Sequence, residues 1–173
     1  MSSFPLARRA SVALLLAACA GAAACFSNVS SADSPALNQV VKLGLTSQEG
    51  APVAVPIAGS RATVLHFWAP ECPSCRATIP ALLQKRRDLE AAGAGILLVC
   101  VLGAGDSPDD ARATLSIWGI EEDFVLDRQG AAMAQIGARA TPAVAIIDAQ
   151  GALSWLAPDG ITPSDVVKAL PAP

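Results

Sequence analysis

Two cysteines stand where an apolar stretch of the chain gives way to an amphipathic one. The apolar stretch ends with VLHFW at residues 64–68, a short loop follows, and Cys72 and Cys75 enclose Pro73 and Ser74. A short apolar run bounded by a loop predicts a buried strand, and leucines at helical spacing after the second cysteine predict a helix. The chain must therefore fold so that a strand leads through one short loop into a helix that carries a pair of thiols.

The position of this dithiol predicts redox chemistry. The first N–H groups of a helix and its positive dipole end favour a thiolate over a thiol, so we expect Cys72 to be nucleophilic. Cys75 lies one helical turn further on and can attack a mixed disulfide formed at Cys72. Pro73 suits the first helical turn, where its missing N–H costs nothing, and the Ser74 hydroxyl can donate a hydrogen bond to the thiolate.

A zinc site and an inert disulfide are the alternatives for a lone CxxC. Zinc needs two further ligands, and besides this pair the chain offers only His66, Cys100 and two cysteines near its N-terminus, Cys19 and Cys25. The sequence contains no second CxxC and no HxxxH pattern. This ligand count favours a redox dithiol with no metal.

Composition narrows the class of protein. The 173 residues are 53% hydrophobic and 16% charged, which fits one compact domain that buries its own core without a disulfide scaffold. The formal net charge of −3 offers no basic surface, so we expect no nucleic-acid partner. Five cysteines, unevenly spaced, are too few for a disulfide-rich fold.

Residues 1–24 have the pattern of an export signal. Two arginines precede an apolar stretch at 12–18 that is too short to span a bilayer, and small residues follow it. Residues 16–19, LAAC, resemble the bacterial lipobox, which predicts cleavage before Cys19 and a lipid on its sulfur. Cys25 is a second candidate for lipidation, and plain cleavage after Ala24 is the alternative to both.

The serine-rich residues 25–36 predict a flexible tether, which leaves one domain at 37–173. We expect this domain to be a monomer outside the cytoplasm, periplasmic or outside-facing, held to a membrane by its lipid anchor. Thiols in an oxidising compartment stay reduced only if electrons are supplied. A reductant there needs an electron donor, which we expect in the membrane.

The rest of the chain alternates strands and helices, which predicts an α/β fold with helices on both faces of a sheet. The expected elements are a hairpin of 40–45 and 52–57, a helix at 76–92 kinked at Pro80, a strand at 96–102, a helix from 107 to about 118, a short strand at 124–126, a short helix at 131–136, strands at 144–147 and 152–156, and a helix at 163–170. Cys100 falls inside an apolar strand, which predicts a buried free thiol.

Residues 68–76 read WAPECPSCR, and Pro80 follows within the same expected helix. Residues 137–142 read GARATP and precede an apolar strand. Together these segments resemble the two landmarks of thioredoxin-like exported proteins of the TlpA, ResA and DsbE type, and the likeness extends over residues 43–170. The resemblance implies a thioredoxin fold: a central mixed sheet with helices on both faces and an N-terminal β extension.

The resemblance also implies roles for single residues. Cys72 would react with the thiols or disulfides of a partner protein through a mixed disulfide, and Cys75 would resolve it, with no cofactor besides this redox-active pair. Pro142 would be cis and face the dithiol, Thr141 would offer its backbone to an extended partner segment, and Trp68 would contact the partner. From the residues alone, an ordinary trans loop proline stays open.

Three positions depart from the family pattern. Glu71 stands where an aromatic or small residue is usual, and its charge should oppose thiolate formation and make the disulfide less oxidising. Thr78 stands where exported reductases often have a glutamate, and Ser74 replaces the usual glycine or proline. These departures bear on the redox potential and on the partner rather than on the dithiol chemistry.

We therefore expect an exported thiol:disulfide oxidoreductase that reduces disulfides in other proteins. A thioredoxin-fold peroxidase is one alternative, although Ala69 stands where such enzymes carry a threonine or serine. A non-enzymatic module that binds copper or a partner is another. For that module His66 is the candidate ligand, but its place in the first core strand favours a buried neutral ring.

Overall fold

The computed structural model describes residues 37–157 and 162–172. The expected export signal, the tether and both candidate lipidation residues, Cys19 and Cys25, lie outside these residues. Within them, no helix is both long enough and apolar enough to cross a membrane.

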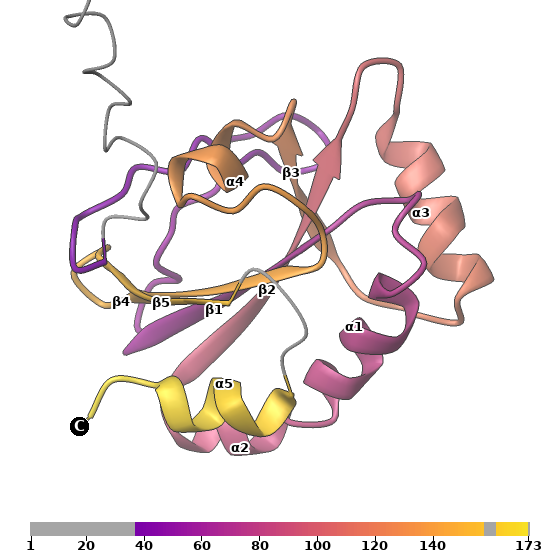
Figure 1. The fold of residues 1–173 in the computed structure, drawn as a ribbon. Helices are drawn as coiled ribbons and strands as arrows, with labels where there is room; N and C mark the ends of the chain where they lie inside the picture. Colours follow the sequence, from indigo (N-terminus) through magenta and orange to yellow (C-terminus); the bar gives the residue numbers. More distant parts are fainter. Residues whose placement is uncertain (1–36, 158–161, 173) are drawn as a thin grey trace, which may run out of the picture. The chain divides into compact units, whose positions relative to one another are not determined.

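Five strands form one mixed sheet in the order β3-β2-β1-β4-β5 (Figure 1). They are β1 Ala62–Trp68, β2 Ala94–Leu102, β3 Phe124–Arg128, β4 Ala143–Asp148 and β5 Leu153–Ala157. β1 is parallel to β2, and β2 to β3, whereas β4 is antiparallel to both β1 and β5. The expected strands of this sheet are confirmed, with ends that differ by a residue or two, whereas the hairpin expected before them is not.

β1 is the central strand, and all of its side chains are buried. It pairs with β2 along one edge and with β4 along the other. Its apolar residues suit a strand that is covered on both faces. The loop that follows β1 therefore starts from the most firmly held part of the sheet.

Helices cover both faces of the sheet, as expected, but unequally (Figure 1). They are α1 Cys75–Leu83, α2 Arg86–Ala91, α3 Pro108–Ile117, α4 Ala131–Gln135 and α5 Pro163–Ala169. Side chains of α1, α2, α3 and α5 pack with the even-numbered residues of β1, such as Val64 and Trp68. α4 and the segment 37–60 pack with its odd-numbered residues, such as Leu65 and Phe67.

The single helix expected at 76–92 is two helices, and the kink expected at Pro80 is a break further along. Gln84 and Lys85 separate α1 from α2. The N–H of Lys85 donates to the carbonyl of Leu82 at 2.9 Å, three residues back instead of four. This bond tightens the last turn and ends α1, whereas the helix passes through Pro80.

Two helices begin at capping boxes, close to the expected positions 107 and 163. The Ser107 hydroxyl accepts from the N–H of Asp110 at 3.2 Å, and the Asp110 carboxylate accepts from the N–H of Ser107 at 3.1 Å. At the start of α5, the Asp165 carboxylate accepts from the N–H of Thr162 at 3.2 Å. These bonds satisfy free backbone groups and fix where α3 and α5 begin.

The N-terminal β extension is smaller than the hairpin expected from 40–45 and 52–57. Within the described residues, this segment makes only single bridges: Val40 with Ala152, and Thr46 with both Pro52 and Leu126. Pro52 and Pro56 have no N–H to donate to a ladder, which limits the pairing. The segment therefore packs on the sheet mostly as irregular chain. The prediction of a hairpin with two full strands is wrong, because only single bridges form.

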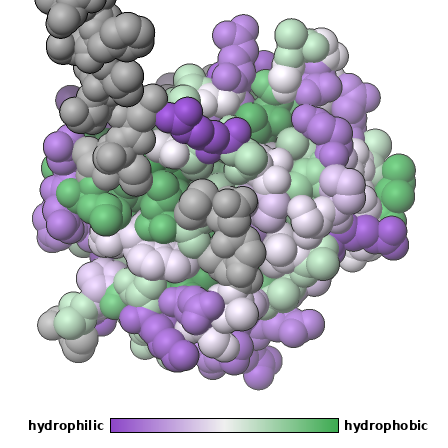
Figure 2. All heavy atoms as spheres, viewed as in Figure 1, coloured by the Kyte–Doolittle hydropathy of each residue, from purple (hydrophilic) through white to green (hydrophobic). Residues whose placement is uncertain are grey.

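The face drawn in Figure 2 is covered mainly by hydrophilic and intermediate residues, with apolar residues in small separate groups. The large apolar side chains described as exposed are Leu37, Val40 and Ile117. Single exposed apolar residues are ordinary on protein surfaces and do not mark a site by themselves.

Candidate active site

A disulfide joins Cys72 and Cys75, whose Cα atoms lie 5.4 Å apart. It lies in the loop between the end of β1 at Trp68 and the start of α1. Two backbone bonds of 3.1 Å shape this loop, from the N–H of Cys72 to the carbonyl of Ala69 and from the N–H of Cys75 to the carbonyl of Cys72. The central strand thus ends in a tight loop that holds the two sulfurs together.

The helix begins within one residue of the expected position 76. α1 starts at Cys75, and Ser74 is its N-cap residue. Pro73, expected in the first helical turn, lies instead with Cys72 in the turn that the Cys75 N–H closes. Cys72 still lies within one turn of the N-terminus of α1, so the helix dipole can act on a thiolate there.

The two sulfurs differ in their access to solvent. Cys72 is 6% exposed, whereas Cys75 is 0% exposed. A disulfide that arrives from solution can therefore reach Cys72 only, and Cys75 can attack only a sulfur that is already bound at Cys72. This difference matches the order of attack that the resemblance implies.

Two polar side chains flank Cys72 in sequence. Oγ of Ser74 lies 3.6 Å from the Cys72 sulfur, and because that sulfur carries no hydrogen in the disulfide, the hydroxyl is the donor. The expected hydroxyl donor is therefore in place. Glu71 is exposed, and among the described residues it has no hydrogen-bond or ion-pair partner.

The Thr141–Pro142 peptide bond is cis, as the resemblance implies. Phe67, near the end of β1, pairs with Ala143 at the start of β4, and these strands are antiparallel. The chain that leaves β1 toward Cys72 and the chain that enters β4 from Pro142 therefore meet at the same end of the sheet. Within the described residues, the backbone of Thr141 makes no backbone hydrogen bond.

Trp68 lies beneath the site rather than on its surface. Its ring is fully buried and packs edge-on against Trp118 and Phe124, at centroid distances of 5.8 Å and 5.6 Å. The prediction that Trp68 contacts the partner is wrong, because no part of the ring is accessible. Side chains alternate along a strand, and this alternation turns Trp68 toward α3.

His66 is a buried neutral ring, as expected. Burial lowers the pKa of its imidazole to about 4. Its Nε2 lies 3.1 Å from Oγ1 of Thr78, and Nδ1 has no hydrogen-bond partner among the described residues. Across residues 37–157 and 162–172, no three side chains of the kinds that bind metals come together.

Cys100 is a buried free thiol in β2, as expected. Burial, together with the charges of Asp106 and Glu71, raises the pKa of Cys100 to about 12. A thiol that stays protonated and inaccessible is not a nucleophile. The redox chemistry of the described residues therefore belongs to the disulfide in the loop after β1.

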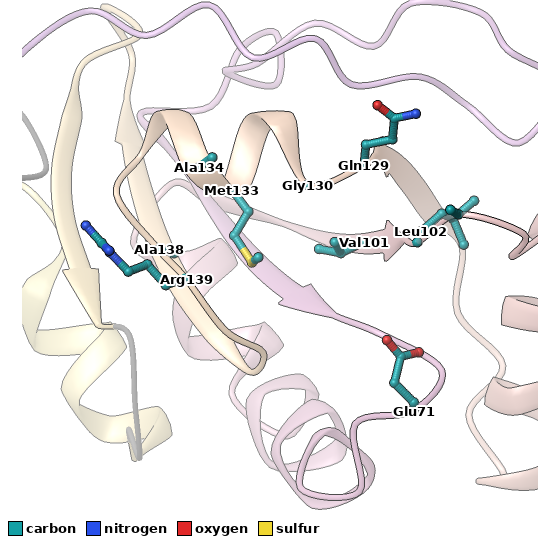
Figure 3. Close-up of a pocket in the computed structure, with 11 residues that line it drawn as sticks. Glu71, Val101, Leu102, Gln129, Gly130, Met133, Ala134, Ala138 and Arg139 are labelled. Carbon is teal, nitrogen blue, oxygen red and sulfur yellow. The ribbon is translucent and has the colours of Figure 1, made fainter. Parts of the chain in front are cut away.

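Sequence reasoning missed a hollow of about 710 Å³ beside the disulfide (Figure 3). Glu71 forms one end of it, Val101 comes from β2, Met133 and Ala134 come from α4, and Ala138 follows that helix. No local sequence pattern marks such a hollow, because the fold brings together segments that are far apart in the chain. The one available signal was the position of Glu71 next to a reactive cysteine.

The fold and the site define a class of protein. The mixed five-stranded sheet, the CxxC disulfide after its central strand and the cis-proline loop at the same end form a thioredoxin-like fold with a dithiol site. The sequence profile of the AhpC/TSA family matches residues 37–156. The chain belongs to the AhpC/TSA family.

Several solved structures share this fold, and two of those compared below are of proteins named as secreted. A secreted thiol-disulfide isomerase from Corynebacterium glutamicum superposes with a TM-score of 0.62 at 21% identity, over 76% of this chain and 83% of that chain. A secreted Mycobacterium tuberculosis disulfide oxidoreductase, homologous to E. coli DsbE, gives a TM-score of 0.54 at 19% identity, over 72% and 91%. StoA from Bacillus subtilis gives 0.57 at 19%, over 78% and 98%. No curated protein matches the chain in sequence.

Proposed function

We propose that this protein is a thiol:disulfide oxidoreductase that reduces disulfides in other proteins outside the cytoplasm. The unequal exposure of its two active-site cysteines carries the proposal: Cys72 keeps some exposure to solvent, whereas Cys75 has none. An inert disulfide needs no such difference, whereas a dithiol that reacts in two ordered steps does. Membership of the AhpC/TSA family supports this chemistry, as do the fold neighbours named as a thiol-disulfide isomerase and a disulfide oxidoreductase.

The reaction passes through one mixed disulfide. In the reduced protein, the Cys72 thiolate attacks one sulfur of the partner's disulfide, and the other partner sulfur leaves as a thiolate and takes up a proton. Cys75 then loses its proton and attacks the Cys72 sulfur, which forms the Cys72–Cys75 bond and releases the second partner thiol. Two electrons and two protons pass from the dithiol to the partner, which leaves the disulfide that the structure contains.

The partner is held along the loop that precedes β4. Pro142 has no N–H to donate, so β4 does not continue its ladder into this loop. The backbone of Thr141 is left without a backbone partner among the described residues, and an extended segment can pair with it. This pairing lays the partner's disulfide across the end of the sheet where Cys72 lies.

The reducing direction rests on Glu71. A carboxylate beside Cys72 disfavours the thiolate, so the reduced form gains less stabilisation than the helix end alone would give it. A dithiol whose reduced form is not stabilised gives up its electrons readily. The export pattern and the lipobox at Cys19 support anchoring at a membrane, where an electron donor can restore the dithiol.

Cysteine variants of the full chain test the function. We expect Cys72→Ser to abolish reduction of a protein disulfide, and we expect Cys75→Ser to accumulate a mixed disulfide that dithiothreitol releases. Cys100→Ala is the matched control, because Cys100 is buried away from solvent, and it should turn over like the unchanged protein. If neither serine variant traps a partner, the assignment fails.

The equilibrium reduction potential of the Cys72–Cys75 pair tests the direction. The pair is titrated against a defined thiol buffer and read by alkylation. A value near that of thioredoxin, roughly −270 mV, supports a reductant, whereas a value near about −120 mV describes an oxidant that donates its disulfide.

A further inference from the structure

We infer that the hollow beside Cys72 receives the residues next to the reactive cysteine of the partner, and that it selects an apolar side chain with a lysine or arginine beside it. The inference rests on the proposed function and names the substrate class of that same site. The substrate is a disulfide in an extended segment, with these residues within about three positions of the cysteine.

The hollow lies next to the reactive cysteine because one of its lining residues is the sequence neighbour of Cys72. Glu71 forms one end of it and is covalently next to Cys72, so the two Cα atoms are about 3.8 Å apart. Ala138, on another side, belongs to the segment that leads to Thr141. A partner segment bonded to Cys72 and aligned on Thr141 therefore brings its neighbouring residues over the hollow.

The hollow offers apolar contacts. Val101, Met133, Ala134 and Ala138 line it, and Figure 3 shows the Met133 side chain directed into the space in front of Val101. Its volume of about 710 Å³ falls within the range of sites that bury small ligands. An aliphatic side chain placed there loses contact with water, which favours it over a small polar one.

The apolar wall is fixed before a partner arrives. The buried carboxylate of Asp127 accepts hydrogen bonds from the N–H of Ala132 at 2.9 Å and from the N–H of Met133 at 2.8 Å. These bonds tie the start of α4 to β3 and hold Met133 in place. A wall that is already ordered loses little conformational entropy on binding, so contacts there translate into selectivity.

The charge at the end near Cys72 is negative. Glu71 is exposed and has no hydrogen-bond or ion-pair partner among the described residues. Asp106 lies at the same end, because its carboxylate accepts from the N–H of Gly103, a lining residue, at 2.8 Å. Arg139 also lines the hollow, but Figure 3 shows it at the end far from Glu71, with its side chain extending away from Val101. A basic side chain is therefore favoured beside the hollow, and an acidic one is repelled.

Peptide mixed disulfides measure this selectivity. Three short peptides each carry one cysteine joined to 2-mercaptoethanol, flanked by Leu and Lys, by Ser and Lys, or by Leu and Glu. The reduced full-length protein is mixed with each, and the rate of thiol release is compared with that for hydroxyethyl disulfide. We expect the Leu-Lys peptide to react about tenfold faster than the Ser-Lys peptide. It should also react about threefold faster than the Leu-Glu peptide at low salt, and high salt should shrink this difference.

Two variants of one helix locate the preference. Ala134→Trp places a large ring in the hollow, and the ratio of the Leu-Lys to the Ser-Lys rate should fall toward one. Ala131→Trp is the matched control, because Ala131 is also an exposed alanine of α4 but does not line the hollow. This control should keep the ratio of the unchanged protein. Glu71→Gln should remove the difference in rate between the Leu-Lys and Leu-Glu peptides. This substitution also changes the reactivity of Cys72, but that change is the same for both peptides and cancels in the ratio of their rates.

Each contrary result has a distinct meaning. Equal rates for the three peptides, with a normal reaction toward hydroxyethyl disulfide, overturn the hollow as a substrate site and leave the proposed function standing. A leucine preference that survives Ala134→Trp also overturns it. A preference that fades as the protein concentration rises assigns the hollow to a second copy of this chain instead. No reaction with hydroxyethyl disulfide overturns the proposed function, and the substrate site with it.

Discussion

Nε2 of His66 lies 3.1 Å from Oγ1 of Thr78, across the interface between β1 and α1. The Thr78 hydroxyl donates to the carbonyl of Cys75 at 3.4 Å, so Nε2 is the donor toward Thr78 and Nδ1 carries no proton. A neutral histidine and a threonine, rather than an acid, therefore lie next to Cys75.

The buried His66 should make the protein less stable as the pH falls. The pKa of His66 is about 4 in the folded protein, against an ordinary value of 6.5. Between these two pH values the unfolded chain binds a proton at His66 and the folded protein does not. Stability from this group is complete above about pH 7 and is lost as the pH falls through 6.5 toward 4. Between pH 7.5 and pH 5, we expect the free energy of unfolding to drop by about 2 kcal/mol, measured by denaturant titration.

His66→Leu isolates this effect, because His66 is the only histidine in the chain. The variant should show a much flatter stability profile over the same pH range, whatever its absolute stability. The shifted carboxylates Glu49, Asp110 and Asp165 have lowered pKa values, so they lose their contribution at lower pH. Parallel profiles for the two proteins would show that His66 is not the group that titrates.

The three described cysteines should differ sharply in alkylation. In the native reduced protein at about pH 8, we expect Cys72 to react with iodoacetamide at least about tenfold faster than the buried Cys75. Cys100, with a pKa raised to about 12 by burial, should stay unmodified until the protein unfolds. Peptide mass spectrometry after timed quenching reads all three sites. Faster labelling of Cys75 would reverse the proposed order of attack.

Removing the Ser74 hydroxyl should make Cys72 less reactive. Oγ of Ser74 lies 3.6 Å from the Cys72 sulfur, and its hydrogen bond favours the thiolate. In Ser74→Ala, the alkylation rate of Cys72 at about pH 6.5 should fall by about two- to tenfold. An unchanged rate would mean that the hydroxyl turns elsewhere once the disulfide is reduced.

Removing the charge of Glu71 should act in the opposite direction. Glu71→Gln relieves the repulsion between the carboxylate and the Cys72 thiolate, so the reduced form gains stability. We expect a reduction potential about 10–20 mV more oxidising than that of the unchanged protein, which corresponds to a two- to fivefold change in the equilibrium constant. A shift toward more reducing values would contradict the role given to this carboxylate.

The packing of Trp68 should matter for stability rather than for partner binding. Trp68→Ala removes a fully buried ring that contacts Trp118 and Phe124, and it should cost about 3–5 kcal/mol of unfolding free energy. Ile117→Ala is the control, because that side chain is 77% exposed, and it should change stability by less than about 0.5 kcal/mol. Comparable losses in both variants would contradict the burial described for Trp68.

The features that could be predicted from the sequence are those that depend on residues close together in the chain. The starts of the helices expected at 107 and 163 could be predicted because a capping side chain bonds a backbone group only three residues away. The apolar run of β2 and the pair of Cys72 and Cys75 are likewise local patterns. These features were enough to indicate the fold and the redox loop.

Features that could not be predicted from the sequence mostly depend on contacts between segments that are far apart in the chain. Trp68 belongs to a familiar motif, but its burial is decided by α3 and β3, which no local pattern places over it. The break between α1 and α2 falls at Gln84 and Lys85, two residues that favour helix, so no local signal marks it. The hollow needs Glu71, Val101 and Met133 to meet, and only the assembled sheet brings them together.

The burial of Cys75 also limits oxidative damage. A peroxide that diffuses from solution meets one sulfur, Cys72, and converts it to a sulfenic acid. The sheltered thiol of Cys75 can condense with that acid, which expels water and restores the disulfide before a second oxidant arrives. If both cysteines lay at the surface, peroxide could oxidise both, and no sheltered thiol would remain to condense with the sulfenic acid. The same sealed position that orders the two steps of exchange therefore keeps Cys72 away from irreversible sulfinic and sulfonic acids.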